Sequence, residues 1–303
     1  MDELTALLAS TIRNATPLAF AALGGLFSER SGVINIGLEG MMLISAFAGV
    51  AGAQGSGSTV FGLLVALAVG LLFGLVHAVA SITFEADQII SGIAINLLAL
   101  GGTGLLMVLF FGSGGTSPRI EPFSRIDIPL LADIPIVGAI FSQSVLVYLL
   151  YALVPITWWV LYRSRFGLRL RAVGEVPEAV DTAGVNVFRL RYIGVGLSGM
   201  LAGLGGAFLS MSLLSAFTEG MTNGRGFIAL AALIFGRWNP VGAFAAALLF
   251  GFAQAVVFRG GIGFTVPQEF IEMFPYLLVI VALVGFGGRA VPPAASGQPY
   301  RKE

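Results

Sequence analysis

The sequence of 303 residues contains no cysteine, one histidine (His77) and one lysine (Lys302). The lack of cysteine excludes disulfides, thiolate zinc sites and cysteine nucleophiles. A single histidine excludes multi-histidine metal sites such as the HExxH motif. A P-loop needs an internal lysine to hold phosphate, and Lys302 is the second residue from the end, so the chain cannot form its own P-loop ATP site. We therefore expect no catalytic, metal-binding or cofactor-binding residues in this chain.

Charge is also scarce. Only 11% of the residues are charged and 57% are hydrophobic, with a net charge of zero and a mean hydropathy of +0.94. Soluble domains typically have about 25% charged and 45–50% apolar residues. The composition therefore indicates a polytopic membrane protein. A helical span takes about 20 residues, which limits the chain to roughly ten spans and leaves no room for a large domain outside the membrane.

The apolar stretches predict an all-α membrane protein with about nine transmembrane helices, between eight and ten, in a single domain over residues 1–288. The expected spans are residues 4–27, 33–53, 59–82, 89–111, 144–162, 192–214, 222–236, 241–258 and 272–286. The stretch 222–236 is short, so whether it spans or is re-entrant stays open. The acidic start gives no sign of a cleavable signal peptide. We expect residues 289–303 to form a disordered cytoplasmic tail.

Arginine placement predicts the orientation. Residues 163–191 form the one long polar segment and carry six arginines, and positively charged loops lie on the cytoplasmic side of a membrane. Counting spans from this segment places the N-terminus outside and the C-terminus in the cytoplasm. The loop 112–142 then lies outside. This topology requires residues 222–236 to cross the membrane fully.

Within the cytoplasmic segment, a short helix is expected around residues 177–184. Pro177 suits a first helical turn, Glu178 and Asp181 suit the positive N-terminal end, and Gly184 suits the position after a helix end. A helix of about two turns is unstable by itself in water. It must therefore dock on its own membrane domain or on a partner, unless the segment is only a connector.

Residues 174–185 read GEVPEAVDTAGV and resemble the coupling helix of bacterial ABC importer permeases. Three longer strings extend the resemblance: FSERSGVINIGLEGMM at 27–42, ADQIISGIAINLL at 86–98 and GRGFIALAALIFGRWNP at 224–240. They resemble signature stretches of ribose-permease-like permeases for nucleosides and simple sugars. Within that family, the chain is similar to the shorter of two permease subunits in nucleoside importers of the basic-membrane-lipoprotein type.

This resemblance implies a type II ABC-importer-like bundle in the bacterial cytoplasmic (inner) membrane. The implied partners are a longer paralogous permease, an extracytoplasmic substrate-binding lipoprotein, and a cytoplasmic ABC ATPase that binds ATP and magnesium. The implied substrate is a nucleoside, with simple sugars and riboflavin as alternatives. The residues implied to couple the permease to the ATPase are Gly174, Glu175, Pro177, Glu178, Ala179, Asp181, Ala183 and Gly184.

Polar residues in or beside the apolar stretches are candidates for a substrate pathway, because ionisable groups in a membrane are costly and often functional. The candidates are Asn35, Glu39, Asn96 and Arg225. Hydrogen bonding between helices is the alternative for Asn35, Glu39 and Asn96, and simple solvation in the outer loop is the alternative for Arg225. His77 is expected to be packed and satisfied. The main rival function is that of an ion-coupled secondary transporter. Such a transporter typically has an internal proton or sodium relay, for which only Glu39 and His77 are candidates.

Glycine, in contrast, is abundant, with 42 residues. Gly70 and Gly74 lie four residues apart within one expected span, and Gly199 and Gly203 within another. This spacing lets helix backbones approach closely in lipid, so we expect tight packing. Sliding or bending of these helices during gating is the alternative. Residues 196–199 (GLSG) also match the pattern of rhomboid intramembrane proteases, but the only histidine precedes the serine, opposite to the rhomboid order.

Overall fold

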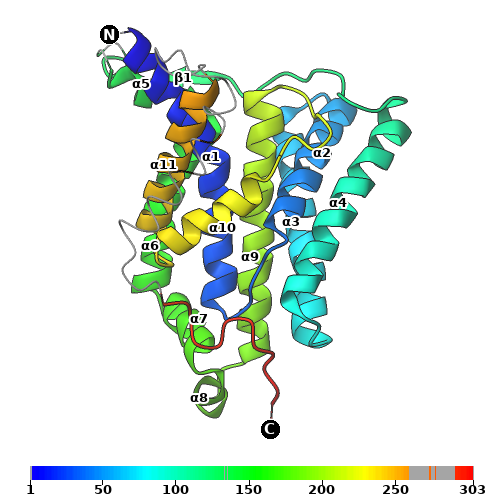
Figure 1. Cartoon of the computed structure of the whole chain (residues 1–303), viewed down its shortest axis with the longest axis vertical. Coiled ribbons are helices and arrows are strands. Elements are labelled where there is room, and N and C mark those ends of the chain that lie inside the picture. Colours follow the sequence, from blue (N-terminus) through cyan, green and yellow to red (C-terminus); the bar gives the residue numbers. More distant parts are fainter. Residues whose placement is uncertain are drawn as a thin grey trace.

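The computed structural model describes residues 2–132, 134, 136–258, 273, 277 and 291–302 and is predominantly helical (Figure 1). The expected span 272–286 falls outside the described residues, apart from 273 and 277. Among the described residues, five helical segments are long and apolar enough to cross a membrane. They are Thr59–Thr83, Gln88–Phe111, Val145–Arg163, Val187–Leu213 and Pro240–Phe258. The fold class is therefore a helical membrane bundle.

Two helices form the centre of the bundle. Helix α1 (Asp2–Arg30) packs against α9 (Val187–Phe208) and α11 (Pro240–Phe258). The middle of α1 is completely buried, from Leu18 to Leu23. Helix α9 continues into a π-helical turn, η2 (Leu209–Leu213). A helix buried on all sides needs apolar residues around its whole circumference, which is why the arginines of α9 are confined to its first turns.

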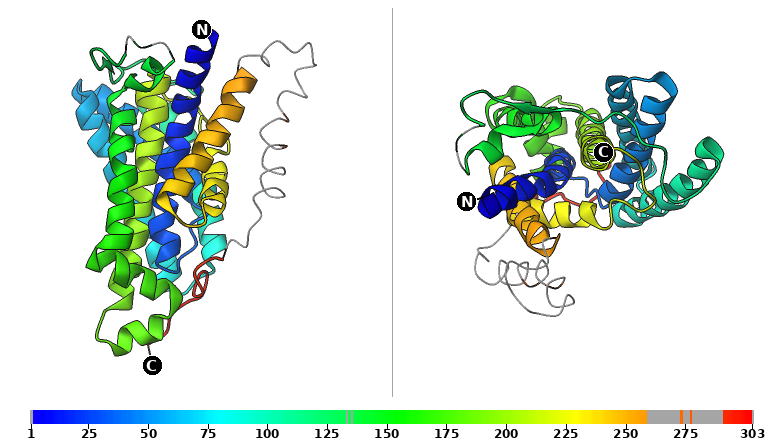
Figure 2. Two further views of the ribbon diagram at one scale, coloured as in Figure 1. Left: turned by 90° about the vertical axis from the view of Figure 1, so that its left-hand side faces the viewer. Right: turned by 90° about the horizontal axis from the view of Figure 1, so that it is seen from above.

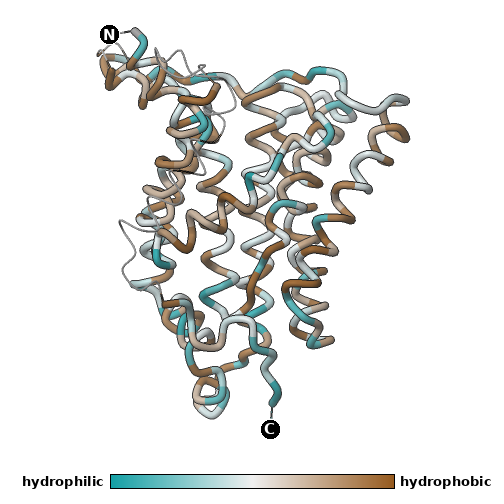
Figure 3. The backbone as a smooth tube through the Cα atoms, in the orientation of Figure 1, coloured by the Kyte–Doolittle hydropathy of each residue, from teal (hydrophilic) through white to brown (hydrophobic). Residues whose placement is uncertain are grey.

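The other long helices flank this centre on two sides (Figures 1 and 2). On one side lie α2 (Leu38–Ser56), α3 (Thr59–Ala78) with its π-helical end η1 (Val79–Thr83), and α4 (Gln88–Phe111). On the other side lies α6 (Val145–Arg163), next to α11. Large apolar side chains of α4, such as Leu97 and Phe110, are exposed, and Figure 3 shows apolar residues along the length of the bundle helices. Such surfaces suit contact with lipid or with another membrane subunit.

The expected close packing of glycines is confirmed between α3 and α9. A Cβ atom added to Gly70 would lie 2.4 Å from the carbonyl oxygen of Gly199, and one added to Gly199 would lie 2.2 Å from that of Gly70. Gly74 and Gly203 are similarly crowded by the opposite backbone. The two helices therefore touch backbone to backbone, as small residues allow in membranes.

Helix α10 (Arg225–Phe235) has 11 residues, which give a length of about 16 Å, roughly half the thickness of a membrane core. The helix therefore does not cross alone. The longer segment around it, however, joins opposite ends of the bundle. Thr218 pairs with Thr116 at one end, and the carbonyl of Trp238 accepts hydrogen bonds from Arg30 at the other.

The two ends of the bundle differ in structure (Figure 1). We call one the coupling end, defined by α7 (Arg165–Glu175) and α8 (Pro177–Thr182). The other, the distal end, carries β1 (Arg125–Asp127), the short helix α5 (Gly138–Phe141) and β2 (Ser142–Ser144). The strands pair antiparallel, with Arg125 opposite Ser144. These paired strands were not predicted, because residues 112–142 were expected to form a loop.

Polar segments of the described residues separate between these two ends. Arg30, Glu85 and the described tail residues 291–302 lie at the coupling end, where Arg301 forms an ion pair with Glu85 at 2.7 Å. The N-terminus lies at the distal end (Figure 1). The N-terminus and the described tail residues therefore lie at opposite ends of the bundle.

Candidate functional site at the coupling end

Helix α8 has the local geometry that its sequence predicts. Pro177 occupies its first position, and the chain leaves the helix at Gly184, whose φ is +78°. The Gly184 N–H donates to the Asp181 carbonyl at 2.8 Å, and the Val185 N–H donates to the Val180 carbonyl at 3.2 Å. Glycine reaches this left-handed conformation without steric cost. Pro177 and Gly184 therefore set the two ends of the helix.

One face of α8 is buried and the other is free. Pro177 and Val180 are buried against the rest of the chain. The exposed positions are Glu178, Ala179, Thr182, Ala183 and Gly184, and Glu175 just before the helix is exposed as well. The exposed face combines two carboxylates with small residues. A helix this short is held in place by its buried face, so its outer face can be presented to another protein.

Gly174 lies in α7, before the exposed face of α8 that carries most of the expected coupling residues. It is buried in α7, and a Cβ atom there would lie 2.4 Å from the carbonyl oxygen of Arg30. Glycine is thus needed for α7 to pack against the end of α1. Helix α7 itself was not expected from the sequence. It buries Leu170 and Val173 and carries α8 at its end.

The C-terminal segment, residues 291–302, packs against the same region without regular secondary structure. The Ala295 N–H donates to the Gly174 carbonyl at 2.9 Å, and the Gly297 N–H donates to the Gly32 carbonyl at 3.2 Å. Arg191, a fully buried side chain of α9, donates to the Gln298 carbonyl at 2.9 Å. These contacts differ from the disordered tail expected from composition. The tail makes these contacts through its backbone groups. Every residue has the same backbone groups, so the amino-acid composition does not reveal such contacts.

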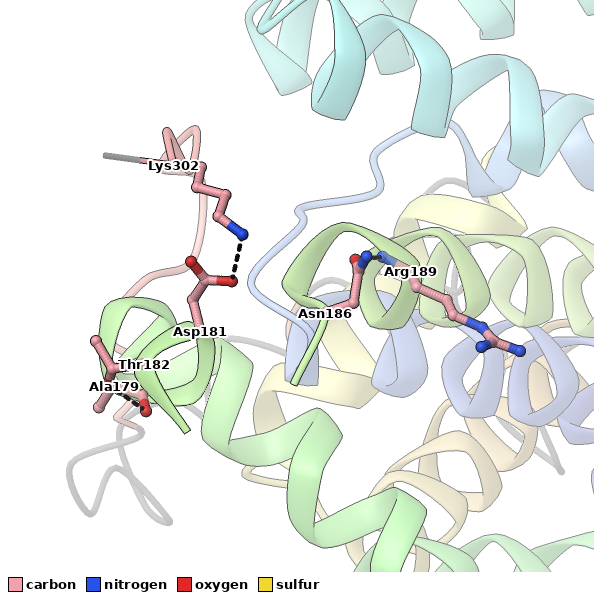
Figure 4. Close-up of polar contacts among 6 residues, drawn as sticks. All are labelled: Ala179, Asp181, Thr182, Asn186, Arg189 and Lys302. Carbon is pink, nitrogen blue, oxygen red and sulfur yellow. Dashed lines mark hydrogen bonds and ion pairs between the residues drawn. The ribbon is translucent and has the colours of Figure 1, made fainter. Parts of the chain in front are cut away.

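Two further tail residues contact the coupling region. Tyr300 is 6% exposed and packs its ring 5.5 Å from that of Phe188. Lys302 lies 3.5 Å from Asp181 of α8, as Figure 4 shows. Asn186 accepts a hydrogen bond from the Arg189 N–H at 2.8 Å and so caps α9 directly after α8. The tail therefore touches α7, α8 and α9 together.

Glu39 and Arg225 are brought close together at the start of α10. The Glu39 carboxylate accepts from the Gly224 N–H at 2.8 Å and from the Gly226 N–H at 2.6 Å. It therefore caps the positive end of α10. Arg225 donates to the carbonyls of Met221 and Thr222 in the preceding turn. Both residues thus have structural partners, and a role in the substrate pathway stays a prediction for them.

The side chains of Asn96 and His77 also form hydrogen bonds within the bundle. The Asn96 side chain accepts from the Gly40 N–H at 2.7 Å and donates to the Ile36 carbonyl at 3.1 Å, so it ties α4 to the start of α2. His77 is completely buried between Ser91 and the carbonyl of Ile34, at 3.0 and 2.9 Å. Asn35 differs from both, because its amide donates to Ser198 while its buried oxygen has no partner among the described residues.

Comparison with known proteins identifies the class. Residues 7–283 match the family described as branched-chain amino acid transport system / permease component. The chain belongs to this permease family. It is 48% identical to the guanosine ABC transporter permease NupQ of Bacillus subtilis, over 99% of this chain and 97% of the relative. It is 40% identical to the nucleoside ABC transporter permease NupC of Lactococcus lactis, over 100% and 98%.

Another relative of this permease is named for a sugar. The putative glucose ABC transporter permease TsgC13 of Haloferax volcanii is 41% identical over 86% of this chain and 79% of the relative. Among solved structures, an inward-facing putative metal-chelate-type ABC transporter matches with a TM-score of 0.42 and 17% identity, over 93% of this chain and 83% of that one. The relatives confirm the expectation of a permease subunit without enzymatic activity of its own.

Proposed function

We propose that this permease is one of two membrane subunits of an ATP-driven importer for nucleosides. The observation that carries the proposal is the match, over essentially the whole chain, to permeases named for guanosine and for nucleosides. The proposed bundle has about nine spans and is of the ABC importer type. Nucleoside import by the ATPase-driven complex is the function we infer for the whole assembly.

A pairing of two unlike permeases is supported by the relatives. The chain is also 28% identical to NupP, a second guanosine permease of Bacillus subtilis, and covers 82% of it. NupP is thus longer than this chain. We infer that the partner here is a longer paralogue. A cytoplasmic ATPase and a substrate-binding lipoprotein outside the membrane complete the proposed complex.

We infer that α8 is the coupling helix and that the coupling end faces the cytoplasm. The N-terminus and the distal end then face outward. The exposed face of α8 (Glu178, Ala179, Thr182 and Ala183) would sit in a groove of the ATPase. ATP binding would move α8 and, through α7 packed at Gly174, the cytoplasmic end of α1. Because coupling is reciprocal, substrate loading must shift the ATPase equilibrium as well.

A sugar is the second candidate substrate, favoured by the relative TsgC13. Nucleosides and sugars share hydroxyl groups on a ring, so the same permease architecture suits both. The binding protein, a separate chain, would select between them. Riboflavin, which carries a ribityl chain, remains the third candidate.

The test of this assembly is a pull-down of the tagged permease from its native membrane in mild detergent, with partners identified by mass. We expect a longer paralogous permease, a cytoplasmic ATPase and a lipid-anchored binding protein. Screening the recovered binding protein against guanosine, glucose and riboflavin then identifies the substrate. Recovery of this chain alone would contradict the heteromeric importer and favour an ion-coupled secondary transporter.

A further inference from the structure

A cavity of about 530 Å³ lies at the distal end, outside the regions that the sequence singled out. It is bordered by Arg13 of α1, by the β1–β2 hairpin and by the end of α9 with η2. Small-molecule sites in proteins usually measure 300–1,000 Å³. The cavity therefore has the size of a ligand site, and it lies at the end that we assign to the outside.

Two serine hydroxyls in the lining of this cavity have no hydrogen-bond partner. The Oγ atoms of Ser144, in β2, and Ser212, in η2, are both buried, and neither has a partner among the described residues. Leaving a buried polar group unpaired is costly, so native proteins retain such groups where a ligand or water can pair with them. Ser212 lies in a π-helical turn, a feature that is frequent at functional sites.

The lining fits a neutral, hydroxylated ligand. Hydroxyl groups both donate and accept, as do the neighbouring Ser144, Ser212 and the buried amide of Gln143. Phe208 adds an apolar surface. The lining also contains the arginines Arg13 and Arg125, which only donate hydrogen bonds, whereas the unpaired hydroxyls of Ser144 and Ser212 can both donate and accept. The two unpaired hydroxyls therefore suit a ligand group that can both donate and accept hydrogen bonds, as a ring hydroxyl does.

We propose that this distal cavity binds the ribose hydroxyls of a nucleoside as it enters the permease from outside. The proposal rests on the proposed nucleoside import. Ser144 and Ser212 hydrogen-bond the ribose, and Phe208 packs against its apolar side. The ribose hydroxyls supply the hydrogen-bond partners that the two serines lack. Binding is favoured because it pairs buried hydroxyls that the fold leaves unpaired.

The test is uptake of radiolabelled guanosine by the reconstituted complete complex carrying Ser144→Ala or Ser212→Ala. Neither hydroxyl forms a hydrogen bond with a described residue. Substitution by alanine therefore breaks no hydrogen bond among these residues, and the complex should assemble normally. We expect the KM for guanosine to rise about 3- to 10-fold for each variant, the loss of one hydrogen bond. The rise should shrink towards onefold with 2′,3′-dideoxyguanosine, which lacks the 2′- and 3′-hydroxyls of the ribose.

Ser45→Ala is the matched control. Ser45 is also a buried serine whose hydroxyl has no partner among the described residues, but it lies in α2 and does not line the cavity. Its KM should equal that of the unaltered complex. An unchanged KM in the cavity variants, or an equal rise in Ser45→Ala, would overturn the ribose site and leave nucleoside import standing. Absence of guanosine uptake by the unaltered complex would instead overturn the proposed function, and this site with it.

Discussion

At the scale of single residues, missing side chains determine how closely the helices approach. Gly70 and Gly199 face each other so closely that one added carbon would overlap a backbone oxygen. Backbone atoms cannot rotate away as a flexible side chain can, so the helices would have to separate. The same argument applies to Gly174 of α7 against Arg30. The GxxxG spacing was enough to predict close packing at Gly70 and Gly199, because it places two small residues on one face of a helix, but it did not predict that these two helices meet.

We predict that Gly70→Ala destabilises the permease by about 1–3 kcal/mol, the usual cost of overpacking a filled interior. Gly101→Ala is the control, because Gly101 is also helical, in α4, and has open space around it. Thermal unfolding of the two purified variants in one detergent measures the difference. Equal midpoints for both would show that the α3–α9 contact is looser than the structure describes.

At the scale of elements, local signals predicted α8 correctly, whereas long-range contacts were not predictable. Pro177 and Gly184 act within a few residues, so their effect is readable from the sequence. Helix α7 was missed because its arginines were interpreted only as part of the polar segment 163–191, although Leu170 and Val173 mark a buried face. The packed tail and the distal cavity depend on residues far apart in the chain, and no pattern in one segment reveals them.

We predict that Gly184→Val uncouples ATP hydrolysis from uptake. A β-branched residue is strained at a φ of +78° by roughly 1–2 kcal/mol, so the end of α8 should shift. The expected result is retained ATP hydrolysis with reduced uptake per ATP in the reconstituted complex. Gly57→Val is the matched control, because Gly57 has a φ of +67° and equally open surroundings but lies far from α8, after α2. Normal uptake per ATP in the Gly184→Val complex would show that Gly184 is not needed for coupling.

The C-terminal segment leads to a second prediction at this scale. Composition predicted a disordered tail over residues 289–303, and removal of a disordered tail would be tolerated. The structure instead leads us to expect that removing residues 291–303 leaves membrane insertion intact but raises ATP hydrolysis in the absence of substrate, because α7 and α8 lose their contacts with the tail. Tyr300→Ala should reproduce most of this rise, since it removes a buried ring. Lys302→Ala should change little, because exposed ion pairs contribute at most about 1 kcal/mol. Unaltered hydrolysis in the truncated complex would show that the tail plays no part in coupling.

At the scale of the whole molecule, composition and charge were sufficient to predict a membrane bundle with two distinct ends. Scarce charge indicates the membrane, and clustered arginines indicate one side of it. Sequence could not decide how residues 214–239 join the ends, because an irregular stretch and the short helix α10 share that path. The polar residues Glu39 and Asn96 were recognisable as unusual, but only the structure shows that they cap and tie helices.

The measurement that tests the central claim most directly is guanosine uptake into proteoliposomes containing this permease, its longer paralogue, the ATPase and the binding protein. We predict uptake that requires internal ATP, the ATPase and the binding protein, and that persists when ion gradients are dissipated. Uptake driven by a proton or sodium gradient without the ATPase would contradict the account. Such a result would show that this permease transports its substrate as an ion-coupled carrier.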